Sequence, residues 1–374
     1  MTSKTWIFLA AALLCTAFHA RAGDAFRPGV LWLDDKGVHI NAHGGGILED
    51  HGVYYWFGEH KVAGTAGNVA QVGVHVYSSR NLTDWRDEGI ALPVSQDPAS
   101  DIVQGAIIER PKVIRNPKTG KYVMWFHLEL KGKRYDAARH GVAVADKVTG
   151  PYVYQGSFRP DAGAWPVDVT AQEKDAATSP ATSFLARDYA GGQMARDMTL
   201  FVDDDGNAYD FYASEENHAM HVSRLTPDFL HSAGQYGRVK PGGDDEAPAV
   251  FKHGGKYYLV TSGLTGWAPN AAKSYVAQNI LGPWTPLGNP VRGTPEQQAI
   301  TFGGQSTYAL TLQRQGCTRH ILMLDVWRKN DAIDGRYVWL PVEWEGDKPV
   351  VRWRDSWTLA DLDKLPCDGP GDHR

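Results

Sequence analysis

Short segments in which apolar residues alternate with polar ones make up most of this chain, and glycine-rich turns separate them. Alternation of this kind places successive side chains on opposite faces of a β-strand. The 3.6-residue spacing of an amphipathic helix is scarce, and turn residues recur at short intervals. The hydrophobic pattern therefore predicts an all-β protein.

One strand pattern recurs along the chain: a tyrosine-rich or otherwise apolar segment that usually follows a glycine turn. A second pattern, an outer-strand sequence, comes after most copies of the first. Multistrand repeats of roughly 45 to 70 residues are typical of propeller blades rather than of a β-sandwich. Five copies predict a five-bladed β-propeller. The copies lie at 52–59, 120–127, 206–215, 255–263 and 320–327, and the outer-strand sequences at 82–89, 149–156, 225–230 and 281–288.

Residues 1–22 have the pattern of a signal peptide. Lys4 gives a positive start, an apolar stretch runs from Trp6 to Phe18, and small residues precede a cleavage position before Gly23. No later segment approaches the roughly 20 apolar residues of a membrane-spanning helix. We expect a secreted or periplasmic protein in which residues 23–374 form a single propeller domain.

Two features depart from the repeat. The stretch 160–194 is rich in Asp, Ala, Thr and Pro and lengthens the gap between the second and third copies. Its composition is compatible with an inserted loop at the propeller rim that caps the pocket, and equally with a disordered excursion. Cys317 and Cys367 are the cysteines left after cleavage, and they either pair, which would pin the C-terminal tail, or remain free thiols.

Charge and composition narrow the choice of partner. The formal net charge is −5 and the pI is near 6.3, so neither nucleic acid nor an anionic membrane would be attracted electrostatically. The chain contains 13 Trp and 16 Tyr, whose flat amphipathic rings suit half-buried sheets and also the faces of sugars. An all-β core and a carbohydrate partner are both compatible with this composition.

Carboxylates stand at corresponding places in three of the repeats. Glu109, Asp197 and Glu246 each belong to the strand that enters a blade, ahead of the tyrosine-rich strand. Such strands line the central funnel, where a carboxylate is costly to bury unless it is paired or functional. Converging carboxylates separate one another's pKa values, which keeps one group protonated beside another that stays ionised. For any single carboxylate, a rim salt bridge is the alternative.

The first repeat has glycines at the corresponding place. His43-Gly-Gly-Gly46 either lets a ligand approach the backbone closely or forms a flexible strand entrance, and Glu59 ends the strand that follows. No group of His, Cys and carboxylates has metal-ligand spacing, and neither a phosphate-binding loop nor a nucleophile elbow is present. The sequence therefore calls for no cofactor and no catalytic metal, and it leaves a structural calcium at the axis open.

Seven segments together carry a family pattern. They are 42–46 (Ala-His-Gly-Gly-Gly), 55–61 (Tyr-Trp-Phe-Gly-Glu-His-Lys), 109–114 (Glu-Arg-Pro-Lys-Val-Ile), 196–200 (Arg-Asp-Met-Thr-Leu), 246–251 (Glu-Ala-Pro-Ala-Val-Phe), 262–269 (Ser-Gly-Leu-Thr-Gly-Trp-Ala-Pro) and 304–307 (Gly-Gln-Ser-Thr). In this order they resemble glycoside hydrolase family 43, and within it they are most similar to the exo-β-1,3-galactanase group. The resemblance implies a five-bladed propeller and an inverting hydrolase that releases galactose from the ends of β-1,3-galactan in a plant-type polysaccharide.

The resemblance also implies catalytic roles. Glu246 matches the general acid, and Asp197 matches the residue that raises the pKa of that acid and orients it. The usual family base is an Asp at the start of the first blade, where this chain has His43. The galactanase group also lacks this Asp and is thought to use a Gln in place of the base. Gln305 matches that Gln. Because a neutral amide is a feeble base, we expect Gln305 to position the water and Glu109 to act as base or electrostatic partner.

Sugar-binding roles follow from the same resemblance. Glu59 matches a residue that grips an axial hydroxyl, Tyr135 and Glu216 are further candidates for the first subsite together with the His43 region, and Trp267 is either a stacking platform or a blade-core aromatic. Two rival functions stay open: an α-L-arabinofuranosidase or β-galactofuranosidase of the same fold, and a non-catalytic carbohydrate-binding propeller. We expect a monomer.

Overall fold

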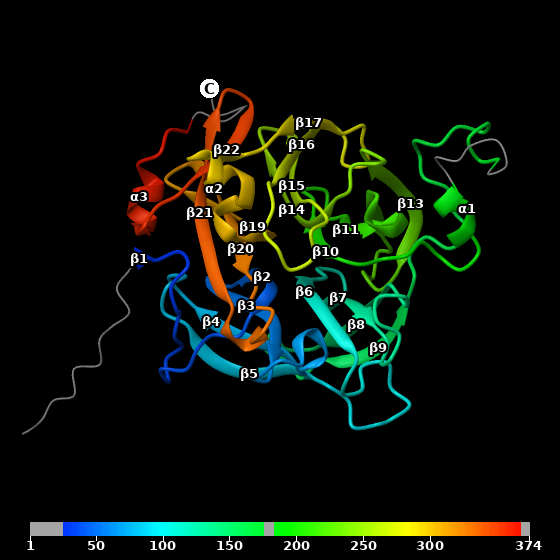
Figure 1. Cartoon of the computed structure of the whole chain (residues 1–374), viewed down its shortest axis with the longest axis horizontal. Helices are drawn as coiled ribbons and strands as arrows, with labels where there is room; N and C mark the ends of the chain where they lie inside the picture. Colours follow the sequence, from blue (N-terminus) through cyan, green and yellow to red (C-terminus); the bar gives the residue numbers. More distant parts are fainter. Residues whose placement is uncertain (1–24, 176–182, 368–374) are drawn as a thin grey trace, which may run out of the picture.

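The computed structural model describes residues 25–175 and 183–367, and most of these residues lie in short antiparallel strands. Four sheets contain four strands each, and a fifth contains five. In the four-stranded sheets every strand pairs with the next along the chain, so each sheet forms from one repeat. The five sheets surround a common centre as blades (Figure 1), which confirms the predicted five-bladed β-propeller.

The strands of each blade run in sequence order from the inner edge outward, except in blade 5, where β18 lies at the outer edge. Blade 1 contains β2 (His43–Asp50), β3 (Val53–Lys61), β4 (Gln71–Ser79) and β5 (Arg86–Pro93), and blade 2 contains β6 (Ile107–Arg115), β7 (Tyr122–Glu129), β8 (Arg139–Ala145) and β9 (Val153–Phe158). Blade 3 contains β10 (Met198–Val202), β11 (Ala208–Ser214), β12 (Ala219–Leu225) and β13 (Ser232–Val239), and blade 4 contains β14 (Glu246–His253), β15 (Lys256–Ser262), β16 (Lys273–Ala277) and β17 (Thr285–Gly288). Blade 5 contains β19 (Gln305–Arg314), β20 (Cys317–Val326), β21 (Arg336–Glu345), β22 (Lys348–Arg352) and β18 (Val291–Arg292).

Helices are short and lie between strands. Among the described residues, none is long and apolar enough to cross a membrane. They are α1 (Ser183–Asp188), α2 (Pro295–Ile300), α3 (Leu359–Asp363) and the 3₁₀ turns η1 (Gly67–Val69), η3 (Glu215–Asn217), η4 (Thr301–Gly303) and η5 (Ala332–Asp334).

Apolar clusters between neighbouring blades hold the ring together. The cluster between blades 1 and 5 is rich in tryptophan, and Trp56 and Trp339 meet edge to face in it with ring centroids 4.7 Å apart. The short strands β1 (Ala25–Phe26) and β23 (Trp357–Thr358) pair beside this cluster, so the two ends of the described chain close the ring. The disulfide between Cys317 and Cys367 fastens the C-terminal segment to β20.

The repeat pattern marks the second strand of each blade. The five tyrosine-rich segments correspond to β3, β7, β11, β15 and β20, so the strands ahead of them, β2, β6, β10, β14 and β19, are the innermost. These inner strands also contact one another around the ring. This arrangement places the starts of the inner strands around one central space, as the sequence pattern predicted.

The described parts of the insertion, 160–175 and 183–194, pack against blade 3. Asp161 accepts hydrogen bonds from Tyr212 and Ser223, each at 2.9 Å, and Asp168 accepts one from Arg238 at 2.9 Å. Helix α1 belongs to this insertion and lies at the outer edge of blade 3 in Figure 1. The predicted signal peptide, residues 1–22, lies outside the described residues.

Candidate active site

A cavity of about 260 Å³ opens where the inner strands converge. A water molecule occupies about 30 Å³ of liquid, so the cavity has room for a body the size of roughly nine waters, close to a single hexose. The cavity brings together six of the residues that the sequence singled out. They are Glu109, Tyr135, Asp197, Glu246, Trp267 and Gln305.

A repeated backbone irregularity places side chains in this cavity. The pairing of the inner strand shifts register after His43, Glu109 and Glu246, and again after Ser306 in blade 5. A β-bulge of this kind re-aims the side chain at the strand end. In three of the four strands the next residue has a left-handed backbone: φ is 60° at Gly44, 56° at Arg110 and 57° at Ala247. For Arg110 and Ala247 this conformation costs free energy, which is commonly stored at functional sites.

Glu246, the first residue of β14, has the properties of a general acid. Burial and, after it, the negative charge of Asp197 raise the pKa of its carboxyl group to about 8, although the positive charge of Arg110 opposes this shift. Glu246 is therefore protonated at neutral pH. The side-chain amide of Gln305 donates a hydrogen bond of 2.9 Å to Oε1 of Glu246, which fixes the orientation of the carboxyl group.

Four contacts hold the amide of Gln305. Its oxygen accepts hydrogen bonds from Arg110 Nη2 at 2.5 Å and from Trp327 Nε1 at 3.0 Å, and both of these groups can only donate. Its nitrogen therefore faces Glu246 and Ser262, each at 2.9 Å. In this arrangement Gln305 orients the acid. That Gln305 positions the attacking water stays a prediction.

Arg110 connects several parts of the site. Its guanidinium group lies 3.0 Å from Oδ2 of Asp197, donates to Gln305, and donates to the backbone oxygen of Ser306 at 3.0 Å. Only 4% of its surface is exposed, so these contacts act in an environment of low dielectric. Arg110 thus links the residue that tunes the acid with the residue that orients it.

Glu109 lies in the same cavity as Glu246 but is held in the ionised state. Burial alone would raise its pKa, but the contact with His127, the charge of Lys61 and the hydrogen bond from Tyr135 lower that pKa to about 2. His127 Nδ1 lies 3.0 Å from one carboxylate oxygen, and the Tyr135 hydroxyl donates to the other at 2.9 Å. A carboxylate this weakly basic is better suited to electrostatic stabilisation than to proton abstraction.

His127 is held as a cation between two carboxylates. Its Nε2 lies 2.9 Å from Glu129, and Glu109 and Glu129 together raise its pKa to about 9 against the effect of burial. Potential ligand atoms of Glu109, His127 and Asp197 lie within 4.8 Å of one another. A metal ion there would have to displace the imidazolium proton, because a protonated ring nitrogen cannot act as a ligand.

Two predicted sugar-binding residues are buried and do not line the cavity. Glu59 is 0% exposed, forms an ion pair with Lys61 and accepts a hydrogen bond of 3.0 Å from the backbone of Arg110. His43 lies between the rings of Trp327 and Tyr337, and burial lowers its pKa well below the usual value. Direct sugar contacts by Glu59 and His43 stay predictions.

Glu216 is the one predicted residue that remains, and it is not among the residues that line the cavity, whereas Trp267 is. Glu216 forms ion pairs with Arg187 of α1 at 2.7 Å and with Arg196, a lining residue, at 3.5 Å. Trp267 lies half-buried in the loop between β15 and β16 and meets Trp327 edge to face, with ring centroids 6.3 Å apart. Because Trp267 belongs to a loop, it is not a blade-core aromatic, and its ring is available as a wall of the cavity.

Sequence reasoning missed several residues that line the cavity. Two of them, His127 and Trp327, stand at the ends of the second and fifth copies of the repeat, where Glu59 stands in the first copy. The ends of the tyrosine-rich strands were therefore a usable signal. Arg110 follows a predicted carboxylate directly, and Asn68, Arg196 and Asn217 lie in connections that have no repeat pattern.

A protonated carboxyl group beside an ionised one in an axial cavity is the arrangement that a glycoside hydrolase needs. Comparisons with known proteins agree. The family model of glycosyl hydrolases family 43 matches residues 176–349. The solved structure of a family 43 β-1,3-galactosidase with galactodeoxynojirimycin is 46% identical, with a TM-score of 0.84, and the match covers 89% of this chain and 100% of that chain.

Two exo-β-1,3-galactanases are also similar. The enzyme from Phanerochaete chrysosporium with β-1,3-galactotriose is 32% identical, with a TM-score of 0.74 over 89% of this chain and 68% of that chain. The enzyme from Clostridium thermocellum is 32% identical, with a TM-score of 0.75 over 89% and 66%. A comparison with curated proteins gives no match. The chain belongs to glycoside hydrolase family 43 and is a glycosidase.

Proposed function

We propose that this chain removes galactose from the non-reducing end of β-1,3-galactan and inverts the anomeric configuration. The observation that carries the proposal is Glu246, an acid with a pKa near 8 that faces a cavity the size of one hexose. Similar solved structures are described as β-1,3-galactosidases and exo-β-1,3-galactanases. Their similarity supports galactose as the sugar in the cavity.

The chemistry assigns one task to each carboxyl group. Glu246 gives its proton to the departing glycosidic oxygen while water attacks the opposite face of the sugar, and the proton that this water loses passes to the solvent once the new C–O bond has formed. The ionised Glu109 stabilises the positive charge that develops on the ring. Asp197 keeps Glu246 protonated until the reaction occurs. In inverting glycosidases the acid and the carboxylate on the other face of the sugar stand roughly 6.5 to 9.5 Å apart, which leaves room for the water.

An exo action follows from the size of the cavity. Because a cavity of about 260 Å³ is close in size to a single sugar, it favours binding of the end unit of a galactan chain. Trp267 offers an aromatic face for the apolar side of the sugar, and Tyr135 offers a hydroxyl group beside Glu109. The signal-peptide pattern of residues 1–22 supports export of the protein to where such polysaccharides occur.

A substrate panel tests this function. We expect free galactose to accumulate from β-1,3-galactan and from β-1,3-galactotriose, with much slower release from nitrophenyl α-L-arabinofuranoside and β-D-galactofuranoside. Release of internal oligosaccharides without galactose would contradict an exo action. Binding of galactotriose without any turnover would identify a carbohydrate-binding propeller instead of an enzyme.

The pH dependence of the reaction provides a further test. Since the reactive form of Glu246 is the protonated one, kcat/KM should fall by about tenfold per pH unit above a pKa near 8. Asp197→Asn removes the charge that raises this pKa and leaves Arg110, which lowers it, without its partner. The alkaline limb of the profile of the Asp197→Asn variant should therefore move to lower pH. A limb that stays in place or moves to higher pH would show that Asp197 does not tune Glu246.

A further inference from the structure

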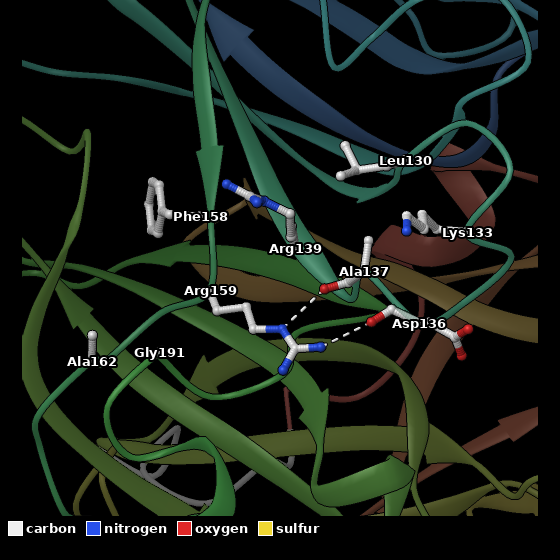
Figure 2. A pocket seen from close by; sticks show the side chains of 9 residues that line it. All are labelled: Leu130, Lys133, Asp136, Ala137, Arg139, Phe158, Arg159, Ala162 and Gly191. Atoms are coloured by element: carbon white, nitrogen blue, oxygen red, sulfur yellow. Dashed lines mark hydrogen bonds between the residues drawn. The ribbon is translucent and has the colours of Figure 1, made fainter.

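Figure 2 shows a second and larger cavity, of about 600 Å³, which shares the β7–β8 loop with the catalytic one. The loop between β7 and β8 separates them. Tyr135 of this loop lines the catalytic cavity, whereas Lys133 and Ala137, each two residues away, line the second. Consecutive residues advance by at most about 3.6 Å, so the backbone positions that face the two cavities lie within about 7 Å of each other along this loop. The two cavities therefore share this loop as a common wall, and a substituent of a sugar bound in the catalytic cavity would reach the second one by crossing it.

The walls of the second cavity combine apolar side chains with positive charges. Leu130 and Phe158 supply apolar surface of the kind that packs against the C–H faces of sugars. Figure 2 shows Lys133 on one side of the cavity and Arg139 nearer its centre, toward Phe158. Arg159 also carries a positive charge, but two of its N–H groups donate to the backbone oxygens of Ala137 and Asp136, at 2.9 and 3.0 Å.

The charge of this region is opposite to that of the chain as a whole. Residues 130–139 contain four cations and one acid, in a protein whose formal net charge is −5. Within the described part of the chain neither Lys133 nor Arg139 takes part in an ion pair. Arg139 donates to the backbone oxygen of Ser157, but its buried Nε has no hydrogen-bond partner there. Two cations without an ion pair therefore face one cavity, whose lining also includes the carboxylate of Asp136.

We propose that the second cavity binds a uronic acid unit carried by the galactan, with its carboxylate held by Lys133 and Arg139. A guanidinium group matches the two oxygens of a carboxylate, and the apolar walls match the ring that bears it. The inference rests on the proposed function, and it names the substrate class: β-1,3-galactan with acidic substituents close to the cleaved end. Arg159 contributes by fastening the loop that carries Lys133.

The test compares one polymer in two forms. The first form is a β-1,3-galactan whose side branches end in glucuronic acid, and the second is the same polymer after chemical reduction of its carboxyl groups. At low salt the wild-type kcat/KM for galactose release should be about fivefold higher on the acidic form, mainly through KM. Because salt screens exposed charges, the preference should shrink toward one as ionic strength rises.

Substitutions assign the preference to the cavity. Lys133→Gln and Arg139→Gln should each lower the ratio toward one and leave kinetics on unbranched β-1,3-galactotriose unchanged. Lys131→Gln is the matched control, because this lysine belongs to the same loop but its side chain lies toward Gly105. A wild-type ratio near one, or a ratio that the Lys133 and Arg139 variants leave unchanged, would overturn the inference. Failure to release galactose from the unbranched trisaccharide would instead overturn the proposed function.

Discussion

Replacing Glu246 by Gln lowers kcat on β-1,3-galactotriose by about 10³-fold, the loss expected when a positioned general acid is removed. The amide has nearly the shape of the carboxyl group and cannot give a proton to the departing sugar oxygen. It also lacks the charge that a buried carboxylate would carry above its pKa, so the fold should not suffer. Steady-state kinetics, together with thermal unfolding of both proteins, measure the two effects separately.

An activated substrate provides the control for the Glu246→Gln variant. Dinitrophenolate departs without protonation, so the loss on dinitrophenyl β-galactoside should be far smaller than on the trisaccharide. An equal loss on both substrates would mean that Glu246 acts in some way other than by proton donation. A fall in stability as large as that of a core substitution would mean that the residue forms a structural contact.

The second large effect is on stability: Lys61→Met should reduce the free energy of unfolding by about 3 to 5 kcal/mol. Lys61 and Glu59 form an ion pair in which both side chains are 0% exposed. Removal of the lysine leaves a buried carboxylate without its counterion. Burial already raises the pKa of Glu59, so the variant takes up a proton there at low pH. The loss should therefore be larger at about pH 8 than at about pH 5.

A double substitution identifies the cause of that loss. Glu59→Gln combined with Lys61→Met removes both charges and should recover most of the stability, as expected for two residues in direct contact. Chemical denaturation of the single and double variants at both pH values measures the coupling. If the double variant is no more stable than Lys61→Met alone, the pair is not the source of the effect. The kinetics of Glu59→Gln would then show whether the residue also serves the sugar, as the family resemblance implies.

The fold and the positions of the main carboxylates could be predicted from the sequence because both depend on a repeat. Each tyrosine-rich segment became the second strand of a blade, and the strand ahead of it became the inner strand. Glu109, Asp197 and Glu246 occupy the same place in three repeats, and rotation about the axis brings them together. A repeat pattern therefore gives a spatial prediction that single residues do not give.

The detailed contacts could not be predicted, because bulges break the alternation that sequence patterns rely on. After Glu109 the strand shifts register and Arg110 adopts a left-handed backbone, so two consecutive side chains both reach the cavity. Strict alternation would have placed Arg110 on the opposite face. Glu59 and Lys61, by contrast, stand two residues apart on β3, so alternation itself places them on one face and their ion pair was open to prediction. The partners of Gln305 come from blades 2, 4 and 5, and no local pattern links them.

The site holds two buried glutamates in opposite protonation states. Glu246 has a carboxylate neighbour and is held protonated, whereas Glu109 has an imidazolium neighbour and is held ionised. His127 can play this part because Glu129 balances it from the other side, and Glu129 in turn accepts hydrogen bonds from the backbone of Ala137 and Ala138. The loop that contains Tyr135 is thereby hydrogen-bonded to Glu129, the carboxylate that balances the charge of His127.

One experiment tests the central claim most directly: proton NMR of β-1,3-galactotriose from the moment of mixing with the wild-type protein or with Glu246→Gln. The account predicts that wild type releases galactose first as the α-anomer, because inversion of a β-linkage gives α, and that the variant releases almost none in the same time. Immediate appearance of the β-anomer, an equal rate in the variant, or intact trisaccharide with wild type would contradict it.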